Sequence, residues 1–139
     1  MSPAIWRATL RTLTSAAAGP HGFTLSVWGS GAVAAHALGL PGFLDVALFV
    51  TGSAMAFWAV HLAGRRAHTA PSVALTRLPN LAGLQLPAVL AAAGTAWVLA
   101  RADLGAATWL AVGAGATAVY WLGATLIVTI SLARSSSDG

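Results

Sequence analysis

Cysteine and lysine are both absent from this 139-residue sequence, and charged residues make up only 7% of it. Without cysteine the chain has no disulfide, no thiolate metal site and no cysteine nucleophile. An ordinary soluble domain carries about 25% charged residues, so this chain has too few ionic groups to cover a surface in water. The scarcity of charge excludes a soluble globular enzyme, a disordered tail and a nucleic-acid binder, although the net charge is +4.

Long apolar stretches take the place of charge, and hydrophobic residues account for 58% of the chain. A helix rising 1.5 Å per residue needs roughly 20 residues to cross about 30 Å of hydrocarbon. Stretches of about this length predict four transmembrane helices, over residues 23–40, 43–64, 81–100 and 106–130. We therefore expect an all-α integral membrane protein, a single domain over residues 1–139 whose last residues, 131–139, form a flexible tail.

The arginines predict how these helices are oriented. With four spans, one side of the membrane carries both termini and the second loop, and six of the seven basic residues fall on that side: Arg7, Arg11, Arg65, Arg66, Arg77 and Arg134. Because basic residues concentrate on the cytoplasmic side, the sequence predicts a multi-pass protein of the cell membrane with cytoplasmic N- and C-termini.

Residues 3–18 predict a short amphipathic helix that lies on the membrane surface. Trp6 belongs to its apolar stripe, and Arg7 and Arg11 line the adjacent edge, where anionic headgroups attract cations. The alternative is a frayed, partly disordered leader. Trp97 and Trp109 fall near the ends of the third and fourth spans, where aromatic side chains mark the lipid interface.

Small residues recur at helical spacing in every span and predict close helix packing, because helices in lipid associate through van der Waals contact. The candidate packing positions are Ser26, Ser30, Gly52, Ala56, Ala111 and Gly115. Four short helices offer limited surface for all of these faces, which favours a homo-oligomer. The alternative is that one compact bundle satisfies every small face.

Ionisable residues in membrane segments are costly and are candidates for function. His36 and Asp45 fall on either side of the first hairpin turn, at the outer rim. They predict either a vestibule that attracts a cation or passes a proton, or a structural lock of the hairpin, and we favour the lock. On the cytoplasmic side, His21 and His61 lie at equal depth on neighbouring spans, a pattern that can ligate a b-type haem.

The polar residues deeper within the spans are uncharged. Thr51, Gly52 and Ser53 would line a narrow neutral constriction if the second span faced a symmetry axis. Gln85 precedes Pro87, whose missing amide hydrogen leaves a backbone carbonyl without its helical donor. Gln85 is therefore a candidate to donate a hydrogen bond to that carbonyl or to form part of a pore.

The missing motifs limit the function further. The sequence has no phosphate-binding loop, no paired-carboxylate site and no zinc spacing, so we expect neither an enzyme nor a bound metal or cofactor. The leading hypothesis is a homo-oligomeric channel or facilitative carrier for a small ion or neutral solute. The alternative is a structural or accessory subunit that packs against a larger membrane-protein partner, and a b-type haem protein is a third, weaker one.

Overall fold

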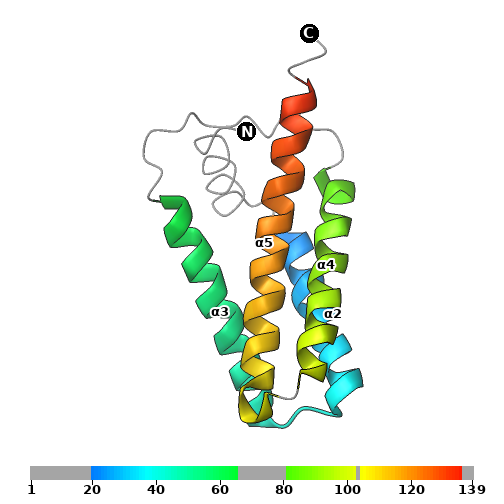
Figure 1. The fold of residues 1–139 in the computed structure, drawn as a ribbon, viewed down its shortest axis with the longest axis vertical. Helices are drawn as coiled ribbons and strands as arrows, with labels where there is room; N and C mark the ends of the chain where they lie inside the picture. The colour runs from blue at the N-terminus through cyan, green and yellow to red at the C-terminus, as the bar shows by residue number, and fades with distance from the viewer. Residues whose placement is uncertain (1–19, 66–80, 103, 136–139) are drawn as a thin grey trace.

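The computed structural model describes residues 20–65, 81–102 and 104–135. Within these ranges the chain forms four α-helices and no strand (Figure 1): α2 (Pro20–Leu38), α3 (Phe43–Arg65), α4 (Leu81–Arg101) and α5 (Thr108–Ser135), the last preceded by a 3₁₀ helix, η2 (Gly105–Ala107). The predicted all-α fold is confirmed, and each helix overlaps one of the predicted apolar stretches. The surface helix predicted over 3–18, with Trp6, Arg7 and Arg11, lies outside the described residues.

Two of the described helices are long and apolar enough to cross a membrane, over Phe43–Gly64 in α3 and Gly105–Ser131 in α5. Within the described part of the chain, α2 and α4 are not among these candidates; their polar residues include Ser26, Ser30 and His36 in α2 and Gln85 and Arg101 in α4. Length and composition therefore identify two of the four predicted spans.

The turn between α2 and α3 is built by glycine and by a helix cap. Gly39 has a φ of 94°, which favours glycine, and its N–H donates to the carbonyl of Ala35 at 2.9 Å, so α2 ends before the predicted Leu40. The Gly42 N–H then donates to Oδ2 of Asp45 at 2.9 Å, which caps the first turn of α3.

At its C-terminal end α5 is longer than predicted. The helix continues to Ser135, so the expected end at residue 130 and the expected tail from residue 131 are both placed too early. No glycine or proline interrupts residues 131–135, and the Ser131 hydroxyl donates to the carbonyl of Ile127 at 2.9 Å within the helix.

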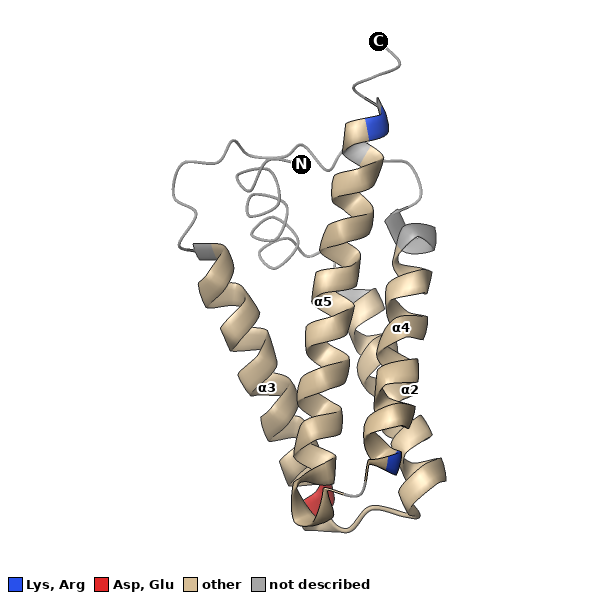
Figure 2. Cartoon of the chain, in the orientation of Figure 1, with Lys and Arg blue, Asp and Glu red and all other residues tan. Residues whose placement is uncertain are grey.

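The antiparallel helices give the molecule two distinct ends (Figures 1 and 2). The hairpin end carries the α2–α3 turn and the α4–α5 connection, with Asp45 and Arg101. The terminal end carries the start of α2, the ends of α3 and α5, and Arg134. Between these ends the described parts of the four helices carry no Asp, Glu, Lys or Arg.

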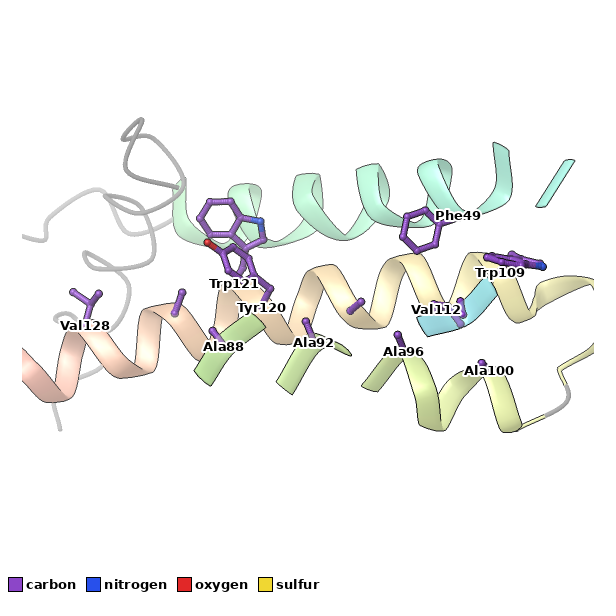
Figure 3. Packing of buried hydrophobic residues seen from close by; sticks show 13 residues of the cluster. Phe49, Ala88, Ala92, Ala96, Ala100, Trp109, Val112, Tyr120, Trp121 and Val128 are labelled. Carbon is purple, nitrogen blue, oxygen red and sulfur yellow. The ribbon is translucent and has the colours of Figure 1, made fainter. Parts of the chain in front are cut away.

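Helix α5 is central, because α2, α3 and α4 all pack against it. Buried alanines recur once per turn on α4, at Ala88, Ala92, Ala96 and Ala100, and lie against α5 (Figure 3). Small side chains allow such close approach. Helices α2 and α4 also pack together, and the small residues Ser26, Ser30 and Ala34 of α2 are buried.

Helix α3 is attached differently, because it packs against α5 while its backbone stays apart from those of α2 and α4. The attachment lies in the half of α3 nearer the hairpin end. A methyl group on Gly52 would overlap the carbonyl oxygen of Leu110, and one on Gly113 would overlap that of Phe49. The Ser53 hydroxyl donates to the Gly113 carbonyl at 3.2 Å. Toward the terminal end the axes of α3 and α5 diverge (Figure 1).

Candidate functional site

The predicted rim residues lie at the hairpin end, and the structure gives Asp45 a structural contact. Its carboxylate accepts the Gly42 N–H, while His36 is exposed near the end of α2. In the described part of the chain, Asp45 and His36 do not form an ion pair. At the same end the guanidinium carbon of Arg101 lies 3.9 Å from the centroid of the Trp97 ring, a cation–π contact.

The three constriction candidates on α3 do not share one surface. Thr51 is exposed and its hydroxyl donates to the carbonyl of Ala47 at 2.7 Å. Gly52 and Ser53 are buried against α5. Consecutive helical residues point about 100° apart, so a pore on the exposed side of α3 would be lined by Thr51 without the other two.

The predicted packing positions are used largely within the chain. Ser26, Ser30 and Gly52 are buried and Ala56 and Ala111 are half-buried, while Gly115 lies against the side chain of Leu99 on α4. This arrangement is the compact-bundle alternative, in which the small faces meet each other. The homo-oligomer stays a prediction.

Gln85 is buried inside the bundle rather than in a pore. Its Oε1 accepts a hydrogen bond from the hydroxyl of Tyr120 at 3.3 Å, which links α4 to α5. A methyl group on Gly22 of α2 would overlap both the Gln85 oxygen and the Tyr120 hydroxyl, so α2 can lie this close to the two side chains only with a glycine at position 22. Tyr120 was not among the predicted site residues.

Aromatic residues from three helices surround Tyr120 in the half of the molecule nearer the terminal end. Phe23 of α2 lies 5.9–6.2 Å, between ring centroids, from Phe57, Tyr120 and Trp121. Phe57 lies 5.9 Å from Trp121 and is stacked on His61 at 6.2 Å. We call these residues the aromatic cluster: Phe23, Phe57, Trp58, His61, Tyr120 and Trp121.

Two nitrogen atoms of the aromatic cluster are buried and have no hydrogen-bond partner among the described residues: Nε1 of Trp121 and Nδ1 of His61. Trp121 itself is only 4% exposed. Phe57 is stacked on the His61 ring and Trp58 meets it at a right angle, with ring centroids 6.2 and 5.9 Å away. The side chain of His21 lies outside the described residues, so the predicted pair of haem ligands falls partly outside the part of the chain that the structure describes.

A pocket of about 390 Å³ opens between α2 and α3 in the half nearer the hairpin end. We call it the seam pocket, and every residue that lines it is apolar or aromatic: Val27, Trp28, Gly31, Ala32, Ala35, Pro41, Val46, Phe49, Val50 and Trp109. Trp28 at its edge is 75% exposed. Trp109, predicted at the lipid interface, lies in the first turn of α5 and is 9% exposed, because it faces the pocket.

The seam pocket and the aromatic cluster are the features of the chain from which a function can be argued. Comparison with known protein families, with characterised proteins and with solved structures finds no match to this chain. Its function must therefore be inferred from the geometry of the seam pocket and of the aromatic cluster.

Proposed function

We propose that the chain is a four-span membrane protein, with both termini in the cytoplasm, that serves as an accessory subunit by accepting a partner's transmembrane helix along the α2–α3 seam. Two features support this proposal: the apolar outer surfaces of the helices, which suit a membrane, and the open seam between α2 and α3, which suits assembly with a partner.

The outer surfaces of all four helices support a lipid environment. Large apolar side chains are exposed on each helix, including Leu25, Met55, Leu90 and Leu126. Only 22% of the apolar stretch of α3 is buried, against 50% for α5, so α3 differs from the buried core helix of a soluble protein. An exposed apolar surface of this extent needs lipid or protein around it.

Helices α2 and α4 also suit a membrane by their length. Their 19 and 21 residues correspond to about 29 and 32 Å, which matches the roughly 30 Å hydrocarbon core. The polar side chains that lower their hydropathy, Ser26, Ser30 and Gln85, are buried within the bundle. Lipid would contact the apolar faces of α2 and α4.

The single observation that carries the assembly function is the open seam between α2 and α3. Helices joined by a short turn normally pack as antiparallel neighbours, but the backbones of these two stay apart. Phe23 and Phe57 bridge them near the terminal end, and the seam pocket remains open beyond that bridge. A helix laid along the seam would place a large side chain in the pocket, as a knob fills a hole.

A channel through a single chain receives less support. The interior is filled by Val112, Ala116, Thr117 and Tyr120, all of them buried. The hydroxyls of Thr125 and Thr129 donate to carbonyls of their own helix at 2.7 Å, so they do not present a polar path. A homo-oligomeric channel or carrier is the second candidate, and it requires a second copy of the chain in the seam.

The test is photo-crosslinking in the membranes of the native host. A benzoyl-phenylalanine replaces Val50 in the seam pocket or, as a control, Leu90 on the exposed side of α4. We expect a defined adduct with one other polypeptide from position 50 only. Gly31→Leu fills the seam pocket and should abolish that adduct, whereas Gly29→Leu, with no atom within 4 Å of its added Cβ, should not.

The other outcomes decide between the alternatives. An adduct with a second copy of the chain would reject the accessory-subunit hypothesis in favour of a homo-oligomer. Measurement of ion or solute flux in liposomes would then test the channel. Adducts with lipid alone at both positions would overturn both proposals.

A further inference from the structure

The two unpartnered nitrogens of the aromatic cluster mark a place where a hydrogen-bond acceptor is missing. A buried donor without a partner costs about 1–3 kcal/mol, and buried Trp N–H groups usually find one. Trp121 Nε1 is such a donor, and on the neighbouring helix Nδ1 of His61 is also buried without a partner and is a donor when it carries the imidazole proton. Neither has a partner within the part of the chain that the structure describes.

The two side chains share Phe57 as a neighbour. The rings of both are in contact with Phe57, at centroid distances of 5.9 Å for Trp121 and 6.2 Å for His61. Figure 3 shows Trp121 extending from α5 toward α3, the helix that carries His61. An acceptor group that enters between α3 and α5 beside Phe57 would meet both side chains.

The arrangement of α3 places that entry at one end. The close backbone contact at Gly52 and Gly113 lies toward the hairpin end, and the helix axes diverge toward the terminal end, where His61 lies. His61 precedes the last residue of α3, Arg65, by four positions, or about 6 Å along the helix. In the four-span arrangement this depth corresponds to the boundary between lipid headgroups and acyl chains.

The chemistry of the donors selects the acceptor. The residues of the aromatic cluster are Phe, Tyr, Trp and His, so the cluster contains no Lys, Arg, Asp or Glu. A phosphate group is normally bound by cationic side chains, while uncharged N–H donors suit a neutral carbonyl oxygen. The neutral imidazole donates from Nδ1 when its proton is on that nitrogen.

We propose that Trp121 Nε1 and His61 Nδ1 bind the ester carbonyl oxygen of a phospholipid from the cytoplasmic leaflet, between the terminal-end halves of α3 and α5. The site is separate from the seam pocket and does not depend on the accessory function. It rests on the four-span arrangement, which the labelling experiment at the end of the Discussion tests independently, so failure of one is distinguishable from failure of the other.

The first test uses the unaltered protein and two probes that differ only at the proposed acceptor. The protein is purified with phosphatidylglycerol carrying ester-linked chains or with its diether analogue, which lacks the carbonyl groups. We expect native mass spectrometry to show about 5–10-fold greater retention of the ester lipid, the change that one hydrogen bond produces. With ¹³C-labelled ester carbonyls, the infrared carbonyl band of the bound lipid should shift to lower frequency.

The second test removes the donors. Trp121→Phe and His61→Phe keep an aromatic ring but lose the N–H, so each should lower the preference for the ester lipid and the double variant should abolish it. Trp58→Phe is the matched control, because Trp58 belongs to the same cluster but is 57% exposed and its nitrogen is not a buried atom lacking a partner. Equal retention of the two lipids by the unaltered protein would overturn the proposal, whether or not the variants fold. So would an ester preference that survives both substitutions.

Discussion

At the scale of single residues, two glycines determine how closely α3 approaches α5. The added methyl group of Gly113→Ala would overlap the carbonyl of Phe49, and its backbone neighbour cannot rotate away. We expect this variant to lose about 1–3 kcal/mol of unfolding free energy, the usual range for overpacking. Unfolding in mixed detergent micelles, followed by circular dichroism, measures the change.

The matched control is Gly94→Ala on α4, where the added methyl group meets no atom within 4 Å. Alanine is the better helix former, so this variant should be equal to the parent or more stable by about 0.5–1 kcal/mol. If Gly113→Ala were as stable as Gly94→Ala, the backbone contact between α3 and α5 would be wrong.

Helical spacing singled out single positions in the sequence, and Ser26, Ser30 and Gly52 among them are buried. The burial of Trp109 could not be predicted, because its neighbours come from other helices. Periodicity along one stretch does not show that α2 and α3 both turn toward this side chain, and the seam pocket could not be predicted for the same reason.

At the scale of helices, the four apolar runs were sufficient to predict where the described helices occur. They were not sufficient to predict which faces meet. Helix α3 has small residues on both sides, Gly52 and Ser53 on one and Thr51 and Ala54 on the other, and the sequence alone does not choose between them. The structure selects the first side because Gly113 lies opposite it on α5.

The exposed face of α3 supplies the second prediction. The chain has no cysteine, so single cysteines can be introduced without removing any and then spin-labelled in liposomes. Labels at Val50 and Met55, which are exposed, should be accessible to oxygen and shielded from a water-soluble nickel chelate, because they face hydrocarbon. Labels at Phe49 and Ser53, which are buried, should be protected from both reagents.

The nickel chelate decides this experiment. Strong relaxation by the chelate at both Val50 and Met55 would mean that α3 faces water, and the membrane arrangement would fail for this helix. Uniform oxygen accessibility at all four positions would instead mean that α3 does not pack against α5.

At the scale of the whole molecule, charge lies at the two ends and the described helices between them carry none. The hairpin end holds Asp45 and Arg101, one charge of each sign, while the terminal end carries Arg134 and is continuous with the arginine-rich segments 1–19 and 66–80. An excess of arginine on one side places that side in the cytoplasm. The hairpin end should therefore face the outside of the cell.

Labelling of single cysteines with a membrane-impermeant maleimide tests this orientation in intact cells. Leu40→Cys and Ala102→Cys lie in exposed positions at the hairpin end and should both react from outside. Ala133→Cys, exposed near the end of α5, should react only after the cells are permeabilised. Leu40 and Ala102 bracket α3 and α4, and Ala102 and Ala133 bracket α5, so this pattern is the one expected when α3 and α4 cross the membrane as a pair and α5 crosses it once. If Leu40→Cys and Ala102→Cys reacted on opposite sides, at least one helix would not span the bilayer. If all three reacted from outside, the terminal end would not be cytoplasmic, and the lipid contact inferred for His61 and Trp121 would belong to the other leaflet.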